Sequence, residues 1–247
     1  MPVGRYIYGF IGEPERKEFN FLGIEKNKVY TVNYRDLAAV VSEAEVKEYD
    51  PTRVNILAHT RVLEEIMRQY LLLPMGFGTV AENEEKIIEL LELNYPELKK
   101  EMKKLQGKVE VGVKVFWERE AVIKEIESRG KNFQELRKKI ASSSAKEAQE
   151  IQLKVGRLVD STVTEWERKY GQRIYNSLKE IAFDSRLNKS LSIEMLLNSS
   201  FLVDKDKEKY FDQRVNELAQ KYEDKLKFKY VGPVPPYNFV SIKLKGA

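Results

Sequence analysis

A strict alternation of side chains over residues 108–117 is the feature that most constrains how this 247-residue chain can fold. The apolar residues at every second position are Val109, Val111, Val113, Val115 and Trp117. Because successive side chains of a β-strand point to opposite faces, this pattern predicts one long, half-buried strand. The order of elements restarts at this strand, so we expect one domain over residues 1–106 and a second over residues 107–247.

The second domain is expected to combine strands and helices around a long helical insertion. Helical patterns begin at Glu118, and capping boxes such as Ser144 with Glu147 open further helices up to about residue 182. Downstream, the sequence predicts strands over 191–197 and 200–203 with a turn at Asn198-Ser199, a helix over 204–222 and a strand over 226–231. Without an insertion at about 119–186, the order is β-α-β-β-α-β, which predicts a ferredoxin-like domain with inserted long helices.

The first domain is expected to be an α+β unit of its own. Its expected elements are strands at about 3–11, 29–32, 37–41 and 71–80, and helices at about 52–70, 83–93 and 95–107. In the first of these helices, apolar residues from Val54 to Ile66 recur at helical spacing and predict a buried face. The sequence as a whole therefore predicts an α+β protein with two domains.

Two stiff segments with aromatic residues stand outside this pattern of regular elements. Residues 73–80 read Leu-Pro-Met-Gly-Phe-Gly-Thr-Val, and residues 232–239 read Gly-Pro-Val-Pro-Pro-Tyr-Asn-Phe. Proline fixes φ and lacks an amide donor, so the three prolines of the second segment cannot lie inside a central sheet ladder. This segment is therefore either a rigid strap that packs Tyr237 and Phe239 onto a domain or a preordered surface for a partner.

Composition and local sequence argue against the common catalytic and ligand-binding sites. The chain has no cysteine and one histidine, His59, which excludes cysteine-based and histidine-rich metal sites. Residues 76–81 match G-x-G-x-x-A, but the glutamates at 82, 84 and 85 would repel a pyrophosphate. A net charge of +4 among 43 basic and 39 acidic residues gives no basis for nucleic-acid binding, and no apolar run is long enough to span a bilayer. We therefore expect a soluble cytoplasmic protein without catalytic, cofactor-binding or metal-binding residues.

Six segments together resemble the GvpF/GvpL family of gas vesicle accessory proteins. They occur in the family's order and cover nearly the whole chain: residues 6–10, 36–42, the helix that carries His59, and residues 73–80, 107–115 and 232–239. Two positions depart from the family's usual pattern, because Val234 replaces a common Trp and Gly76 replaces a frequent Arg. The first departure removes a large side chain of the kind that anchors partners.

The resemblance implies a non-enzymatic role in gas vesicle formation, in the cytoplasm and in association with gas vesicles. It implies an assembly factor or minor vesicle component that binds the small hydrophobic shell protein GvpA, and other accessory proteins as further partners. A partner that covers apolar surface of the shell protein would oppose its aggregation during synthesis. On this hypothesis, the partner-binding residues lie in the two stiff segments: Leu73, Pro74, Phe77, Pro233, Pro235, Pro236, Tyr237 and Phe239.

The sequence leaves two other functions open. The expected helix from Ser144 to Ala182 carries an apolar stripe, which would suit a helical scaffold within an accessory-protein complex. Packing of that stripe onto the protein's own sheet is the structural alternative. An enzyme that holds a small ligand in the ferredoxin-like half is the third hypothesis, although no set of groups converges on a reaction.

Overall fold

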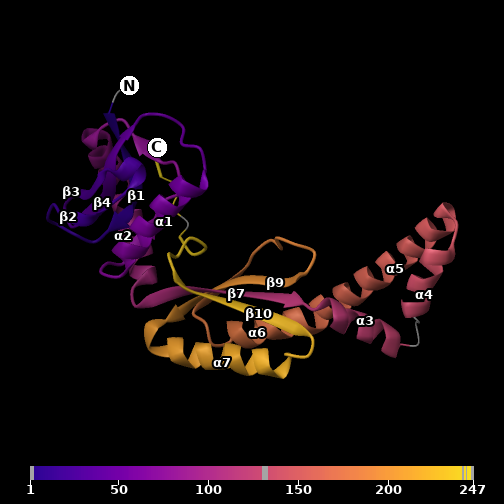
Figure 1. Ribbon diagram of the computed structural model, residues 1–247. Helices are drawn as coiled ribbons and strands as arrows, with labels where there is room; N and C mark the ends of the chain where they lie inside the picture. Colours follow the sequence, from indigo (N-terminus) through magenta and orange to yellow (C-terminus); the bar gives the residue numbers. More distant parts are fainter. Residues whose placement is uncertain (1–2, 130–132, 241, 243, 246–247) are drawn as a thin grey trace. The chain divides into compact units, whose positions relative to one another are not determined.

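The computed structural model describes residues 3–129, 133–240, 242 and 244–245, which form helices and strands around two sheets (Figure 1). The chain divides into two compact units. Unit 1 comprises Met1–Glu110 with Pro233–Ala247, and unit 2 comprises Val111–Gly232. The domain boundary expected at residue 106 lies close to Glu110, after which the chain passes from unit 1 into unit 2. Residues 233–247, however, group with unit 1, although the sequence placed them in the second domain.

Unit 1 is built on an antiparallel sheet with two long helices. Its elements are β1 (Val3–Ile11), β2 (Glu18–Leu22), β3 (Lys28–Tyr34), β4 (Leu37–Glu45), α1 (Arg53–Met67), β5 (Leu72–Pro74), β6 (Val80–Ala81) and α2 (Glu84–Leu105). The sheet has the order β2-β3-β4-β1-β5, and β6 also pairs with β1. The strand β2 and the separate strand β6 were not expected from the sequence, because both are short.

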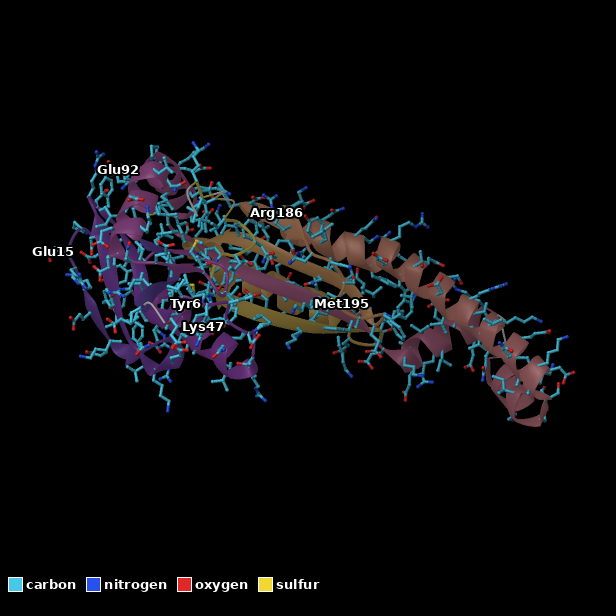
Figure 2. The ribbon with its side chains drawn as sticks, turned by 90° about the horizontal axis from the view of Figure 1, so that it is seen from above. Tyr6, Glu15, Lys47, Glu92, Arg186 and Met195 are labelled. Atoms are coloured by element: carbon cyan, nitrogen blue, oxygen red, sulfur yellow. The ribbon has the colours of Figure 1, made fainter. Side chains whose placement is uncertain are left out.

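Both faces of the centre of this sheet are buried. Tyr6 and Tyr8 of β1 pack in one cluster with Val62 and Leu63 of α1, and Figure 2 shows Tyr6 inside unit 1. Ile7, which lies between the two tyrosines and points to the other face, is buried as well. The helix α2 packs against β3 and β4. A sheet covered on both faces explains why β1 and β4 are apolar along most of their length.

The two helices expected over residues 83–93 and 95–107 form one continuous helix, α2, so that expectation is wrong. Pro96 lies inside this helix. A proline in a helix interior removes one hydrogen bond and costs about 3 kcal/mol. The buried stripe of α2 continues on both sides of Pro96, from Ile87 to Leu105. Packing of this stripe therefore outweighs the local cost of the proline.

Unit 2 combines a second sheet with the helical insertion. Its elements are β7 (Lys108–Trp117), α3 (Arg119–Ser128), α4 (Phe133–Ser142), α5 (Ala145–Trp166), α6 (Gln172–Lys179), β8 (Asp184–Leu187), β9 (Met195–Asp204), α7 (Glu208–Lys221) and β10 (Leu226–Val234). The strand order is β10-β7-β9-β8. β7 has the bounds that the alternation predicts. The order of elements outside the insertion is compatible with the expected ferredoxin-like domain.

The hairpin turn expected at Asn198-Ser199 is wrong, because both residues lie in the middle of the buried strand β9. The connection from β8 to β9 is instead residues 188–194. Ser199 Oγ donates a hydrogen bond to the Val113 carbonyl (3.0 Å), and Asn198 Nδ2 donates one to the Lys189 carbonyl (2.7 Å). Because these polar side chains are paired, a turn-favouring sequence is tolerated inside a central strand.

The long helix expected from Ser144 to Ala182 is present with one interruption. A π-helical turn over Glu167–Gly171 separates α5 from α6, and α6 ends at Lys179. The capping box at Ser144 is confirmed, since its side chain and that of Glu147 each accept the other's backbone N–H. The last helix of the insertion therefore ends at residue 179. The strand expected over residues 191–197 is wrong, because β8 is the first strand after the insertion and residues 191–194 lie in the connection to β9.

Candidate partner-binding site

The C-terminal strap, residues 233–239, is anchored in unit 1 by Phe239. The Phe239 side chain is fully buried, and Pro235 and Pro236, which precede it in the sequence, are buried as well. The N–H of Tyr237 donates to the Pro235 carbonyl (2.7 Å), and the N–H of Phe239 donates to the Pro236 carbonyl (3.1 Å). The amides of Tyr237 and Phe239 are therefore satisfied in a turn that follows β10. Pro233 lies in β10 itself, which is an edge strand and so accommodates a proline.

Polar groups of α2 and β7 fix the end of the strap. The buried carboxylate of Glu110 accepts hydrogen bonds from the backbone N–H of Asn238 (3.1 Å) and from its side-chain amide (2.5 Å). Lys104 Nζ donates to the Phe239 carbonyl (2.8 Å). These contacts all lie within unit 1, which is the physical reason why residues 233–247 group with it rather than with the sheet that precedes them.

The other stiff segment lies along β1 as β5 and β6, with the Phe77 turn between them. A Cβ at Gly9 of β1 would lie 2.5 Å from the Leu73 carbonyl oxygen, so this close pairing requires glycine. Gly78 has φ +86°, and its N–H donates to Tyr6 Oη (2.8 Å). The turn thereby places the Phe77 ring against Tyr6, with 6.2 Å between ring centroids.

His59 of α1 links the two stiff segments. Its buried imidazole has Nδ1 3.0 Å from Tyr6 Oη and Nε2 3.0 Å from Tyr237 Oη. Tyr6 Oη also accepts the Gly78 N–H, and the tautomer of His59 decides which ring nitrogen donates to its tyrosine. The Phe77 ring meets the imidazole edge to face at 5.8 Å. We call Tyr6, His59, Phe77 and Tyr237 the His59 junction.

Burial keeps the His59 junction uncharged at neutral pH. It lowers the pKa of His59 to about 4, an effect that a hydrogen bond to the Met75 carbonyl partly opposes. Burial also raises the pKa of Tyr237 to about 12 and moves the pKa of Tyr6 above its ordinary value. Both ring nitrogens of His59 are paired, so neither is available as a base. The junction is thus suited to holding segments together rather than to proton transfer.

Exposed apolar side chains lie on α1 and on the two stiff segments that meet at the His59 junction. Val54 is 76% exposed and Leu57 56% exposed on the first turns of α1, and Ile56 is exposed between them. Tyr237 is 45% exposed although its hydroxyl lies against His59, and Phe77 is half-buried. We call Val54, Ile56, Leu57, Phe77 and Tyr237 the α1–strap patch.

The structure divides the eight partner-binding residues expected from the sequence into buried and accessible ones. Five are buried within unit 1: Leu73, Pro74, Pro235, Pro236 and Phe239. Pro233 and Tyr237 are exposed, and Phe77 is half-buried. In this structure, the accessible part of the expected set therefore reduces to these three side chains.

Three accessible apolar residues of α1, Val54, Ile56 and Leu57, were missed by the reasoning from sequence. The spacing from Val54 to Ile66 predicted one buried face, but Val54 and Leu57 are exposed and burial begins at His59. Periodicity identifies the apolar side of a helix, but it does not say how far along the helix the rest of the protein covers that side. Their position ahead of the sole histidine is the one local signal that could have singled them out.

Three further kinds of site were considered within the described residues: a metal site, a membrane-spanning helix and a polar hollow. Within the described ranges, no three His, Asp or Glu side chains gather as a metal site, and none of the described helices could cross a membrane. A polar hollow of about 390 Å³ includes Glu84 in its lining. That carboxylate already pairs with Arg16 (3.1 Å) and Tyr30 (3.0 Å), so the hollow is an ion-pair network of the protein itself.

Comparison with known proteins gives one consistent match over the whole chain. A family model described as "Gas vesicle synthesis protein GvpL/GvpF" matches residues 4–241. Gas vesicle protein F of Nostoc sp. strain PCC 7120 is 28% identical over 246 residues, which cover 98% of this chain and 100% of that protein. The crystal structure of the gas vesicle protein GvpF from Anabaena sp. PCC7120 has a TM-score of 0.77 at 28% identity, covering 97% of this chain and 99% of that one. The corresponding GvpF structure from Microcystis aeruginosa has a TM-score of 0.75 at 25% identity, with the same coverage.

Proposed function

Because this chain belongs to the gas vesicle synthesis protein GvpL/GvpF family, we propose that it is an assembly factor or minor component of gas vesicles that binds the hydrophobic shell protein GvpA. The role is non-catalytic, and the protein acts in the cytoplasm in association with gas vesicles. The observation that carries the proposal is the exposure of the apolar side chains of the α1–strap patch, among which Tyr237 is held by its contact with His59.

The physical case rests on the fixed geometry of the patch. The buried Phe239 and the Asn238–Glu110 hydrogen bonds hold the strap in place, so Tyr237 is presented with little freedom left to lose on binding. Full burial of a large apolar side chain contributes about 1.5–3 kcal/mol. Val54 and Leu57 together with Tyr237 therefore offer several kcal/mol of gross stabilisation to an apolar partner. A shell protein whose apolar strands or helix face would otherwise aggregate is a partner of this kind.

Co-expression with the shell protein tests the proposal. The patch variant is Val54→Ser/Leu57→Ser, and the matched control is Leu22→Ser, which replaces an exposed apolar residue of β2 outside the patch. We expect the wild type and the control to keep GvpA soluble and to co-purify with it, and the patch variant to retain less than about a tenth as much. Equal GvpA recovery with the patch variant, at an unchanged melting temperature, would sink the proposal.

A second candidate function uses the helical insertion. Through residue 160, no side chain of α5 is buried, and Ile151, Val155 and Leu158 are only half covered. α5 as a whole packs against α3 and α4. From Thr162 onwards the stripe becomes part of the core of unit 2. The structure thus supports packing for one half of the stripe and leaves the other half accessible, which favours a docking role for α4 and the first half of α5.

A deletion separates the two candidate functions. We replace residues 133–158 by a short Gly-Ser linker and measure capture of the other accessory proteins and of GvpA from the producing cell. The scaffold function predicts loss of the accessory proteins with GvpA binding retained. Retention of both would count against the scaffold, and loss of GvpA alone would move the shell-protein site from the patch to the insertion.

A further inference from the structure

The exposed face of α2 carries opposite charges at its two ends. The residues of this face, on either side of Pro96, are Glu85, Glu89 and Glu92 in the first half and Lys99, Lys100 and Lys103 in the second. Helix residues three and four apart lie on the same side, and this side is opposite the buried stripe that runs from Ile87 to Leu105. Figure 2 shows Glu92 at the margin of unit 1. The helix thus presents an acidic end and a basic end along one accessible surface.

The basic end borders a groove with an apolar floor. Its volume is about 560 Å³, and its lining includes Leu71, Pro96 and Met102 beside the three lysines. Lys100 and Lys103 have no ion-pair partner within the described part of the chain. The helix macrodipole favours cations at this end of α2, but it does not account for apolar side chains between them. A groove of this kind fits a helical segment that carries both carboxylates and apolar side chains.

The acidic end of the same helix combines carboxylates with exposed aliphatic side chains. Glu85 has no ion-pair partner among the described residues. Ile88 and Leu93 are 38% and 54% exposed next to the glutamates. A solvent-facing helix half with the unpaired carboxylate of Glu85 and accessible aliphatic side chains is the counterpart that the groove requires.

The spacing makes the two ends complementary in an antiparallel arrangement. Glu85 and Lys103 lie equally far on either side of residue 94, about 13 Å at 1.5 Å per residue. Glu89 and Lys99 lie closer to residue 94, again at equal distances on its two sides. Two antiparallel copies of α2 that cross near residue 94 would bring each glutamate opposite the corresponding lysine of the other copy. A two-fold axis produces every such pair twice.

We propose that two copies of this chain associate through their α2 faces as an antiparallel, two-fold symmetric dimer. The acidic half of each α2 occupies the lysine-rimmed groove of the other, with Ile88 over the apolar floor. This contact needs no shell protein and is separate from the α1–strap patch. Lys99 also pairs with Asp36 (2.6 Å) and Glu89 with Lys86 (2.7 Å) within one chain. The unpaired groups therefore dominate, and exposed ion pairs make the association weak and sensitive to salt.

Sedimentation equilibrium with charge-reversal variants tests the dimer. The acidic variant is Lys103→Glu, the basic variant is Glu85→Lys, and the control is Lys209→Glu, which reverses an exposed lysine of unit 2. We expect wild type and control to dimerise at low salt and to weaken about tenfold or more between 50 mM and 500 mM NaCl. Each α2 variant alone should be monomeric, and an equimolar mixture of the two should form a heterodimer.

The equimolar mixture of the two α2 variants controls for misfolding, because two misfolded variants would not recover specific association. A monomeric wild type at low salt over the full concentration range overturns the proposal. Self-association of either α2 variant at the wild-type strength, or the absence of a heterodimer in the mixture, overturns it as well.

Discussion

Replacement of His59 by glutamine should remove a pH-dependent part of the stability of unit 1. The imidazole is 3% exposed, and burial lowers the pKa of His59 from 6.5 to about 4. Between these two values the unfolded chain binds a proton that the folded chain does not bind. The free energy of unfolding therefore falls as the pH is lowered through this window, and it is unaffected by His59 above it.

The size of the effect follows from the two pKa values. One pKa unit corresponds to about 1.4 kcal/mol, so wild-type unit 1 should lose about 2 kcal/mol at pH 5 and about 3 kcal/mol at pH 4, relative to pH 7, through His59 alone. Carboxylates titrate in the same range and contribute to both proteins equally. The difference between wild type and His59→Gln isolates the histidine, because glutamine does not titrate.

Urea unfolding followed by the near-ultraviolet circular dichroism of tyrosine is the suitable assay. Trp117 and Trp166 both belong to unit 2, so their fluorescence reports that unit and serves as an internal control. The tyrosine transition should show a stability gap between wild type and His59→Gln that narrows by about 3 kcal/mol from pH 7 to pH 4. The tryptophan transition should show the same pH profile in both proteins.

Parallel pH profiles of the tyrosine transition would refute the reasoning. They would mean that His59 titrates alike in the folded and unfolded chains. The imidazole would then be exposed to water in the folded protein. It would not be held in the buried contacts with Tyr6 and Tyr237 that the hydrogen-bond distances indicate.

Three further substitutions test the packing of the strap and of the two sheets. Phe239→Ala should lower the stability of unit 1 by about 3–5 kcal/mol in thermal unfolding, because the side chain is fully buried, and a loss below about 1 kcal/mol would contradict its role as the anchor. Gly9→Ala should push β5 away from β1, since its Cβ would lie 2.5 Å from the Leu73 carbonyl oxygen; an unchanged melting temperature would show that the strands can shift without cost. Ser199→Ala should leave the buried Val113 carbonyl without this donor and cost about 1–3 kcal/mol in tryptophan-monitored urea unfolding, whereas a neutral result would mean that another donor replaces it.

The elements that the sequence predicted well are those whose burial follows a single local period. β7 occupies residues 108–117, as the alternation of its side chains requires. The predictions of an interrupted helix at Pro96 and of a turn at Asn198-Ser199 were wrong for the same reason. Each carries a local preference for ending an element, at a cost of no more than about 3 kcal/mol. The burial of α2 and β9 along their length outweighs such preferences, and that burial depends on neighbours far away in the sequence.

The candidate site was predictable only in part. Residue types alone marked the strap and the Phe77 turn as unusual, and they placed His59 on a helix. The contact between them was not predictable, since Tyr237 is 178 residues away from His59 along the chain. Such a contact depends on the strap returning to unit 1, and the local sequence after β10 does not specify where the chain goes next.

The strap must be fixed to unit 1 before its exposed residues can bind a partner. Phe239 and the amide of Asn238 fix it to unit 1, and only then is Tyr237 held beside His59 with an exposed ring edge. A substitution at Phe239 should therefore reduce stability and partner binding together. A substitution of Tyr237 leaves that anchor in place, so its loss of binding should exceed its loss of stability. Val234 is half-buried and smaller than the Trp that the resemblance leads us to expect at this position, so we propose that the partner-binding contribution of this strap falls mainly on Tyr237.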